Sequence, residues 1–346
     1  MTKTIMVGGV PIGGEHPVTI QSMTNTKTEA IDQTVRQIRE LAAAGCDIVR
    51  STANTKAAAL ALRDIKPQIK LPLVADIHFD YRLALLAMES GADKIRINPG
   101  NMPKKGLLEI IACAKQHRIP IRIGVNSGSI EKDLLERYGA GAEAMTESLA
   151  RSIALFEDEG FKWLVLSAKA SNVKLTIDVN RSIHQRWDYP IHLGVTEAGF
   201  DQSAIIKSSI GIGSLLADGI GNTIRVSLTG DPLKEIPVAR EILQSLGLKK
   251  GIDIISCPTC GRTDIDVEAI ARQVKEQVGT LDKNLSVAIM GCIVNGPGEA
   301  READIGIAGG KEQALLFRKG IIVGKFPQSD IVEKLVTEIK RLGDLE

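Results

Sequence analysis

The segment 93-DKIRINPG-100 has the form of a short buried strand that ends in polar residues, and this form recurs through the first two thirds of the chain. Seven further segments repeat it: 18-VTIQSMTNT-26, 47-DIVRST-52, 72-PLVADIH-78, 120-PIRIGVNSG-128, 163-WLVLSAK-169, 190-PIHLGVTE-197 and 223-TIRVSLTGDP-232. Amphipathic stretches such as 29-EAIDQTVRQIRELAAAG-45 and 233-LKEIPVAREILQSLG-247 lie between them, and each of these two ends in a glycine that fits a helix C-cap.

Eight strand and helix units in series predict an α/β protein whose residues 1–247 form a TIM (β/α)₈ barrel. A doubly wound open sheet would give the same local pattern, but an unbroken series of eight favours closure. The series ends at 247-GLKKG-251, and residues 248–346 carry strand and helix signals of their own. They are predicted to form a second, small α/β domain.

The polar residues at the predicted strand ends share one face of the barrel. Catalytic groups stand at the C-terminal ends of barrel strands, and side chains alternate between interior and exterior along each strand. Arg96 is in phase with Asn98, and Arg122 is in phase with Gly124 and Asn126. The same parity joins Asp76 with His78, Ser167 with Lys169, and Arg225 with Ser227.

With Arg50 and Glu197 included, positive charge exceeds negative charge by three at this end of the barrel; the residues are Arg50, Arg96, Arg122, Lys169 and Arg225 against Asp76 and Glu197. A single arginine would more commonly pair with an acid on the barrel's outside. A cluster of cations in a low-dielectric mouth persists mainly where an anionic ligand compensates it. The predicted substrate is therefore a small phosphate or diphosphate ester, which arginine binds in a bidentate manner.

Three cysteines lie in the second domain: Cys257 and Cys260 in 256-SCPTCGR-262, and Cys292 in 291-GCIVNGPGEARE-302. A C-x-x-C turn brings two sulfurs to one metal, but a closed site needs four ligands. The domain has no histidine. Three thiolates with a carboxylate such as Glu299 fit an iron–sulfur cluster better than structural zinc. Zinc stays open as an alternative because C-P-x-C-G resembles a zinc-ribbon knuckle.

Composition narrows the class of protein. Lysine plus arginine (43) nearly cancels aspartate plus glutamate (42), and aromatic residues make up only 3% of the chain, so neither nucleic acid nor a membrane surface is an expected partner. The sequence has no signal-peptide pattern and no run of 18 apolar residues, which predicts a cytoplasmic protein.

Two further features are assigned structural roles. The glycine-rich stretch 208-SSIGIGSLLADGIGN-222 matches no nucleotide-binding motif and is interpreted as a helix entry whose N–H groups help to hold phosphate. Among the histidines, only His78, next to Asp76 in phase, is a candidate for the site. The other four are interpreted as structural or solvated: His16, His117, His184 and His192.

Six motifs in this order resemble one family: 17-PVTIQSMTNT-26, 75-ADIHFD-80, 95-IRINPGN-101, 122-RIGVNSGS-129, 256-SCPTCGR-262 and 291-GCIVNGPGEA-300. It is the 4-hydroxy-3-methylbut-2-enyl diphosphate synthase family, iron–sulfur oxidoreductases of the methylerythritol phosphate route to isoprenoids. The resemblance spans nearly the whole chain and is to the compact bacterial form. It implies a barrel that binds 2-C-methyl-D-erythritol 2,4-cyclodiphosphate and a C-terminal domain similar to those of sulfite and nitrite reductases.

The resemblance also implies residue roles. The C-terminal domain would hold a 4Fe-4S cluster through Cys257, Cys260, Cys292 and Glu299. The diphosphate contacts would be Arg50, Arg96, Arg122, Lys169, Arg225 and Ser227, while Asn126 and Glu197 would lie near the reacting carbons. Asp76 and His78 match motif positions as well. The implied reaction is a two-electron reductive ring opening with loss of water.

Partners follow from the same resemblance. Electrons would arrive from a ferredoxin or flavodoxin, and the chain would form a homodimer in which the cluster domain of one subunit faces the barrel of the other. Two other functions fit the same residues. One is a non-redox transferase or lyase, as in pterin-binding barrels, with zinc as a staple. The other is a metabolite-sensing barrel fused to a zinc-ribbon binding module.

Overall fold

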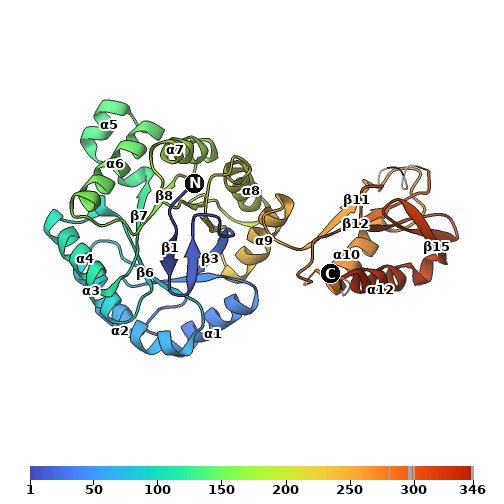
Figure 1. Ribbon diagram of the computed structural model, residues 1–346, viewed down its shortest axis with the longest axis horizontal. Helices are drawn as coiled ribbons and strands as arrows, with labels where there is room; N and C mark the ends of the chain where they lie inside the picture. Colours follow the sequence, from blue (N-terminus) through green and yellow to red (C-terminus); the bar gives the residue numbers. More distant parts are fainter. Residues whose placement is uncertain (280, 295–297, 299–300, 344–346) are drawn as a thin grey trace. The chain divides into compact units, whose positions relative to one another are not determined.

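The computed structural model describes residues 1–279, 281–294, 298 and 301–343 of the 346-residue chain. The chain divides into two compact units, Met1–Leu248 and Lys249–Glu346, each with its own hydrophobic core (Figure 1). Among the described residues, no helix combines the length and the apolar character needed to cross a membrane.

The first unit contains a parallel eight-stranded sheet that closes into a barrel, as the sequence predicts. Its strand order is β8-β7-β6-β5-β4-β3-β10-β9, and a parallel bridge from Leu166 to Ile191 joins the two edges. Each strand falls within a predicted segment: β3 (Thr19–Met23), β4 (Ile48–Thr52), β5 (Leu73–Asp76), β6 (Lys94–Ile97), β7 (Ile121–Asn126), β8 (Leu164–Lys169), β9 (His192–Leu193) and β10 (Thr223–Ile224).

Helices surround the strands in an outer ring (Figure 1). They are α1 (Ile31–Ala43), α2 (Lys56–Ile65), α3 (Tyr81–Glu89), α4 (Lys104–His117), α5 (Lys132–Tyr138), α6 (Ala142–Asp158), α7 (Val173–Arg186), α8 (Asp201–Ala217) and α9 (Glu235–Ser245). Short 3₁₀ turns are η1 (Lys66–Gln68), η2 (Pro99–Asn101), η3 (Ser127–Ser129) and η4 (Pro232–Lys234). Side-chain oxygens of Thr55, Asp80 and Asn172 accept backbone N–H groups at the starts of α2, α3 and α7, which fixes where these helices begin.

Strand parity separates the core of the first unit from the barrel interior. Alternate strand residues such as Val49, Ile95 and Ile121 pack in the cluster formed with the helices. The residues between them therefore point into the barrel. A hairpin of β1 (Ile5–Val7) and β2 (Val10–Ile12), which the sequence reading did not predict, packs against Ile48 and Val74 at the starts of β4 and β5. This apolar cluster closes the N-terminal end of the barrel.

The interpretation of 208–222 as a helix entry is wrong. Helix α8 begins at Asp201, so Gly211 and Gly213 lie inside it, where backbone N–H groups are used by the helix itself. Gly211 has a packing role instead: a Cβ atom there would lie 2.6 Å from Cγ2 of Val195.

In its described residues, the second unit has a five-stranded sheet and two long helices. The strand order is β11-β12-β13-β14-β15. Strands β11, β12 and β13 are parallel, β14 is antiparallel to β13, and β15 is antiparallel to β14. The strands are β11 (Ile252–Ser256), β12 (Leu285–Met290), β13 (Ile305–Ala308), β14 (Gln313–Arg318) and β15 (Ile321–Pro327). Helices α10 (Val267–Val278) and α12 (Ile331–Gly343) share one apolar cluster with the sheet, and η5 (Gln328–Asp330) precedes α12. The predicted small α/β fold is confirmed, although β14 was not predicted.

The two glycines inside α8 provide a matched test of packing. Gly211→Ala should lower the free energy of unfolding of the barrel, because overpacking against Val195 costs about 1–3 kcal/mol. A Cβ atom at Gly213 would meet no described atom within 4 Å. Gly213→Ala should therefore raise the free energy of unfolding by about 0.5–1 kcal/mol through helix propensity. Urea unfolding followed by circular dichroism measures both. Equal changes in the two variants would contradict the contact.

Candidate functional site

The barrel interior above the apolar floor is lined with buried polar side chains. Asp76, Lys94, Arg96, Arg122 and His192 are each less than one tenth exposed. Strand register places Asp76 of β5 beside Arg96 of β6, and Arg96 beside Arg122 of β7. Most of the residues predicted from strand parity therefore come together inside one barrel.

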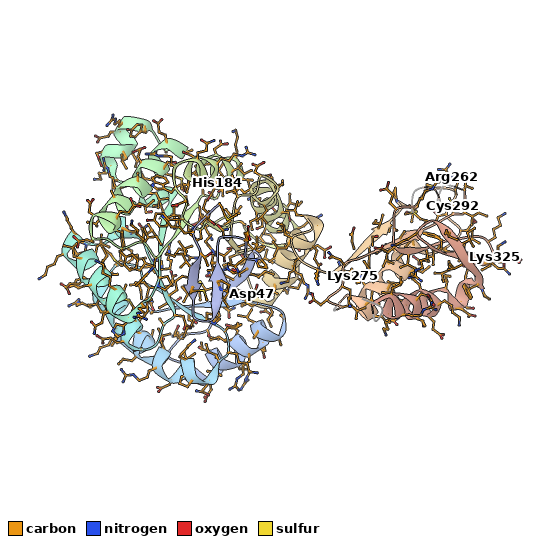
Figure 2. The ribbon with its side chains drawn as sticks, in the orientation of Figure 1. Asp47, His184, Arg262, Lys275, Cys292 and Lys325 are labelled. Atoms are coloured by element: carbon orange, nitrogen blue, oxygen red, sulfur yellow. The ribbon has the colours of Figure 1, made fainter. Side chains whose placement is uncertain are left out.

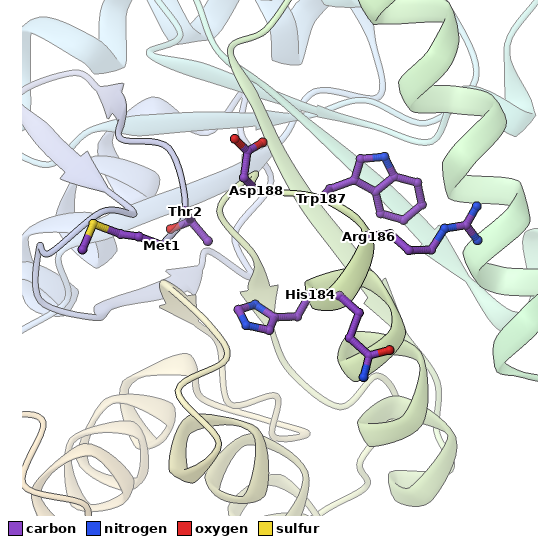
Figure 3. A pocket seen from close by; sticks show the side chains of 7 residues that line it. Met1, Thr2, His184, Arg186, Trp187 and Asp188 are labelled. Atoms are coloured by element: carbon purple, nitrogen blue, oxygen red, sulfur yellow. The ribbon is translucent and has the colours of Figure 1, made fainter.

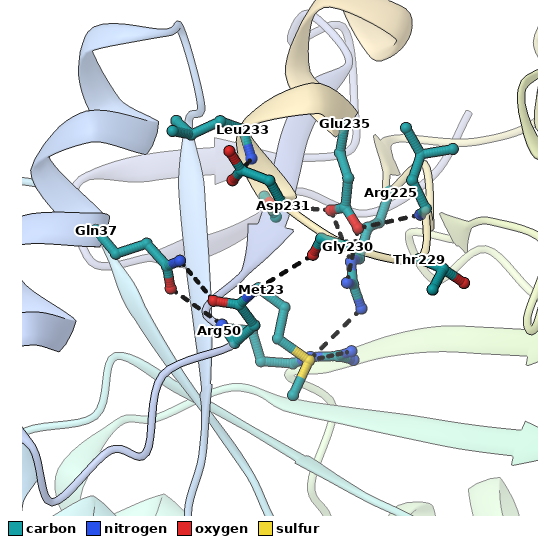
Figure 4. Close-up of polar contacts among 12 residues, drawn as sticks. Met23, Gln37, Arg50, Arg225, Thr229, Gly230, Asp231, Leu233 and Glu235 are labelled. Atoms are coloured by element: carbon teal, nitrogen blue, oxygen red, sulfur yellow. Dashed lines mark hydrogen bonds and ion pairs between the residues drawn. The ribbon is translucent and has the colours of Figure 1, made fainter. Parts of the chain in front are cut away.

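Arg50 and Arg225 converge on one sulfur atom (Figure 4). Nε and Nη2 of Arg50 donate to Sδ of Met23 at 3.1 and 2.9 Å, and Nη1 of Arg225 donates to the same sulfur at 3.5 Å. A thioether is a weak acceptor with no charge. It holds the two guanidinium groups close together without neutralising them.

Glu235, at the start of α9, anchors Arg225 from the other side. Its two carboxylate oxygens accept Nη2 and Nε of Arg225 at 2.9 and 3.1 Å, a bidentate ion pair, and Ser22 Oγ donates to it at 2.8 Å. The Glu235 side chain is only 2% exposed. The pair fixes the arginine while leaving Nη1 turned toward Met23.

Asp76 is the second interior carboxylate. It accepts Nη1 of Arg96 at 3.3 Å and lies 3.3 Å from Nε2 of His78. Burial alone would raise the pKa of Asp76, but Arg50, His78 and Arg96 together outweigh it and hold this pKa well below its usual range. Asp76 is therefore an anion across the working pH range.

Two glycines on the interior face make room for cationic side chains. A Cβ atom at Gly124 would lie 2.9 Å from Nε of Arg96, and one at Gly194 would lie 2.7 Å from Nζ of Lys169. In β7, Gly124 is in phase with Arg122, so a larger side chain would point into the barrel at this place. The absence of side chains here lets Arg96 and Lys169 extend across the interior.

The cations depress one another's affinity for protons. Burial lowers the pKa of Arg50 to about 10, with Asp76 opposing that shift and Arg225 adding to it. Burial, followed by the neighbouring arginines, lowers the pKa values of Lys169 and Arg122 well below their usual ranges. An anion placed among them would be attracted by every one of these groups.

The remaining predicted residues lie at the ends of strands or in the loops that follow them. Asn126 ends β7, and its backbone N–H donates to Ser129 Oγ at 3.2 Å. Ser227 follows β10 and is half-buried. Glu197 follows β9 on the surface with φ of 52°, the left-handed region that a non-glycine residue seldom adopts. Such backbone strain is frequent at functional sites.

Sequence reasoning missed four interior residues: Met23, Lys94, His192 and Glu235. Parity alone could have found Lys94, two residues before Arg96, and His192, two residues before Gly194. His192, interpreted from the sequence as structural or solvated, is not solvated, since the ring is fully buried in the barrel with Nδ1 3.3 Å from Thr223 Oγ1. Burial, followed by Lys169 and Arg122, lowers the pKa of His192 well below its usual range, so the ring is neutral. No sequence pattern marks the partnership of Glu235 with Arg225.

An open pocket of about 410 Å³ lies away from these residues (Figure 3). It is formed by Met1, Thr2 and the end of α7 with the residues that follow it, including His184 and Trp187. Its charged groups have partners elsewhere: Arg186 pairs with Glu147, and Asp188 pairs with Lys3. The pocket contains no predicted site residue and is not a candidate site.

In the second unit, the cysteines follow the ends of two adjacent parallel strands. Cys257 follows β11 and Cys292 follows β12 by two residues. The backbone N–H of Gly291 donates to Sγ of Cys257 at 3.1 Å, which links the two loops. Figure 2 shows Cys292 and Arg262 at the same end of this unit.

Cys260 is exposed, and hydrogen bonds from Arg262 lower the pKa of its thiol. This favours the thiolate, which is the form that binds metals. Glu299, the predicted fourth ligand, lies outside the described residues. Within residues 1–279, 281–294, 298 and 301–343, no three histidine, cysteine or acidic side chains are close enough to hold a metal ion.

Gly124→Ala tests the steric role of the interior glycines. The new methyl group should displace the Arg96 guanidinium and weaken binding of pyrophosphate, a probe of the anion site, by about tenfold, because charge-assisted hydrogen bonds are lost. Titration calorimetry measures the dissociation constant. Gly128→Ala is the control, because it meets no atom within 4 Å. Unchanged binding in Gly124→Ala would refute the steric argument.

Comparisons with solved structures support the barrel fold. Dihydropteroate synthase from Vibrio fischeri ES114 is 12% identical and superposes with a TM-score of 0.51 over 71% of this chain and 98% of that chain. The N-acetylneuraminic acid synthetase from Leptospira borgpetersenii is 13% identical, with a TM-score of 0.50 over 71% of this chain and 91% of that chain. At these identities the likeness concerns the fold alone.

Comparisons of sequence reach further. A protein from Clostridium perfringens named 4-hydroxy-3-methylbut-2-en-1-yl diphosphate synthase (flavodoxin) is 54% identical over 99% of both chains. One of the same name from Geobacter sulfurreducens is 51% identical over 99% of this chain and 98% of the relative. The family model described as the GcpE TIM-barrel domain matches residues 2–240, and that of the GcpE protein C-terminal domain matches residues 253–341. The chain belongs to the GcpE family.

Proposed function

We propose that this chain is a 4-hydroxy-3-methylbut-2-en-1-yl diphosphate synthase. It converts 2-C-methyl-D-erythritol 2,4-cyclodiphosphate into the linear 4-hydroxy-3-methylbut-2-enyl diphosphate, consuming two electrons and two protons and releasing water. The observation that carries the proposal is the barrel interior, where buried cations outnumber carboxylates, in a chain 54% identical to a protein of that name. A cyclic diphosphate supplies the negative charge that this interior lacks.

The barrel binds the diphosphate. Arg50, Arg96, Arg122, Lys169, Arg225 and Ser227 are the proposed contacts. Arginine suits this role because its planar fork matches two phosphate oxygens at once. Glu235 and Met23 keep Arg225 oriented before the substrate arrives, so less conformational entropy is lost on binding. Asp76 holds Arg96 in the same way, with His78 beside it.

Asn126 and Glu197 are the proposed groups at the reacting carbons. Asn126 is the last residue of β7 and Glu197 lies in the loop after β9, so both stand at C-terminal ends of barrel strands, where TIM-barrel enzymes hold their catalytic residues. The Glu197 carboxyl group would give a proton to the departing hydroxyl so that it leaves as water. The Asn126 amide would orient the substrate by hydrogen bonds to its hydroxyl groups.

The second unit fits an iron–sulfur cluster by its donor chemistry. Cys257, Cys260 and Cys292 are unpaired thiols, Cys260 is shifted toward the thiolate, and a backbone N–H already donates to the sulfur of Cys257. Backbone donors to cysteine sulfur tune the potential of such clusters. These cysteines, with Glu299 as the fourth residue, would hold a 4Fe-4S cluster. When bound, the cluster supplies electrons one at a time and a site that a substrate oxygen can approach.

Flavodoxin is the proposed electron donor, in keeping with the name of the relatives, and ferredoxin is the alternative. We also propose a homodimer in which the cluster domain of one chain serves the barrel of a second chain. Mixing an inactive Arg122 variant with an inactive Cys292 variant tests this arrangement, because one intact site would re-form in a mixed dimer. If the mixture recovers no activity, this arrangement of the homodimer is excluded.

Metal and sulfide analysis tests the cofactor and the activity together. Protein purified without oxygen should contain about four irons and four sulfides per chain and turn over the cyclodiphosphate with reduced flavodoxin. Cys292→Ser should lose turnover while its barrel still binds pyrophosphate. One zinc without sulfide, or turnover without a reductant, would overturn the proposed function.

Glu197→Gln tests the proton donor. The variant keeps the size of the side chain but cannot give up a proton, so kcat should fall by about 10²- to 10⁴-fold with little change in KM. Steady-state kinetics with reduced flavodoxin separate the two constants, and Glu143→Gln, in helix α6, is a matched control. A rise in KM with unchanged kcat would show that Glu197 binds substrate without transferring a proton.

A further inference from the structure

The buried amine of Lys94 has no role among the proposed diphosphate contacts. It is the first residue of β6 and points into the barrel, two residues before Arg96. Its side chain is fully buried, and Nζ makes no hydrogen bond to any described protein group. An amine in this position loses its hydration and gains no protein partner in return, which is unfavourable for an ordinary structural lysine.

The groups around Lys94 offer it no free carboxylate. Nε and Nη1 of Arg122, on the adjacent strand β7, are likewise buried without a partner among the described residues. Both carboxylates that face the barrel are already engaged, since Asp76 holds Arg96 and Glu235 holds Arg225. The charged and titratable groups of the same interior are Arg50 (β4), Asp76 (β5), Arg96 (β6), Arg122 (β7), Lys169 (β8), His192 (β9), Arg225 (after β10) and Glu235 (α9).

Lys94 is not surrounded by apolar side chains alone. Gln21 on β3 and His192 on β9 also leave side-chain nitrogen or oxygen atoms without a partner in the part of the chain that the structure describes. Strand register places Gln21 beside Ile48 and Lys94 beside Val74, each two residues before the level of Arg50 and Arg96. Several donors in one enclosed polar layer are arranged to meet something that is not part of the chain.

We propose that Lys94, together with Arg122, forms the deepest part of the anion site, and that Lys94 takes up a proton when a phosphoryl group binds. The inference rests on the proposed function, because it extends the diphosphate site of the barrel downward by one layer. A phosphoryl oxygen is the acceptor that both side chains lack, and its charge stabilises the ammonium form.

The electrostatic environment of Lys94 also supports proton uptake on anion binding. Burial, followed by Arg122 and Arg50, lowers the pKa of Lys94 well below its usual range, so the amine is neutral before a ligand enters. A bound anion reverses the sign of the local field. The proton comes from solvent, the lysine gains one positive charge, and no other bond changes.

Lys94 should lower the stability of the folded chain although it strengthens anion binding. The unfolded chain keeps Lys94 protonated up to about pH 10.4, whereas the folded chain releases this proton. Folding is therefore penalised increasingly as the pH falls below that value. Lys94→Met, which keeps the length of the side chain, should raise the melting temperature, and by more at pH 7 than at pH 10. It should also weaken pyrophosphate binding by about 10- to 100-fold.

The experiment combines melting curves with titration calorimetry of the full chain. Pyrophosphate is titrated at pH 8 in two buffers of different ionisation enthalpy, which gives the number of protons taken up. The wild type should take up more protons than Lys94→Met, because titration of pyrophosphate itself is common to both. Lys66→Met is the matched control: Lys66 pairs with Asp93 outside the barrel, so its loss should change neither affinity nor proton uptake.

The outcomes separate this inference from the proposed function. Wild-type affinity and proton number in Lys94→Met would overturn the role of Lys94 while leaving the anion site in place. A wild type that does not bind pyrophosphate would overturn the anion site and this inference with it. Loss of the fold in both Lys94→Met and Lys94→Leu would show that the amine is a structural group, which also overturns the inference.

Discussion

Mutual repulsion among buried cations is the constraint on which the first unit depends. A guanidinium or ammonium group in a low-dielectric interior is unfavourable unless it is paired, yet pairing every one would cancel the charge that attracts an anion. The barrel resolves this conflict by partial pairing. Glu235 and Asp76 each take one arginine, Met23 gives two arginines an uncharged acceptor, and Arg122 and Lys94 have atoms without a described protein partner.

The rest of the barrel supplies the rigidity that such an arrangement requires. The apolar cluster between strands and helices and the floor made by the β1–β2 hairpin hold the walls in place. Gly124 and Gly194 leave the volume that Arg96 and Lys169 occupy. The orientation of the cations is therefore built in before any ligand binds, and the strain of like charges is balanced by burial elsewhere in the same unit.

Both units place their reactive side chains by the same geometric means. In parallel sheets, the C-terminal ends of neighbouring strands meet at one edge, so residues far apart in sequence come together in the loops that follow. In the barrel these strand ends and loops carry His78, Asn126 and Glu197. In the second unit they carry Cys257 and Cys292, after β11 and β12, and the hydrogen bond from Gly291 to the Cys257 sulfur links the two loops. The buried cations and these cysteines thus belong to separate units, each with its own core.

The sequence by itself determined the eight strands, the face of the barrel that carries Arg50, Arg96 and Arg122, and the cysteines of the second unit. Periodicity is a local property, so a run of alternating residues is sufficient to read it. It did not determine the partners of those residues. Glu235 meets Arg225 because α9 packs beside β3, the strand that pairs with β10. Met23 meets Arg50 across two adjacent strands, and Gly211 inside α8 packs against Val195. Only the tertiary structure decided that Lys94 and His192 are fully buried and that Nζ of Lys94 has no partner among the described residues. Burial depends on what the closed barrel brings from every other strand.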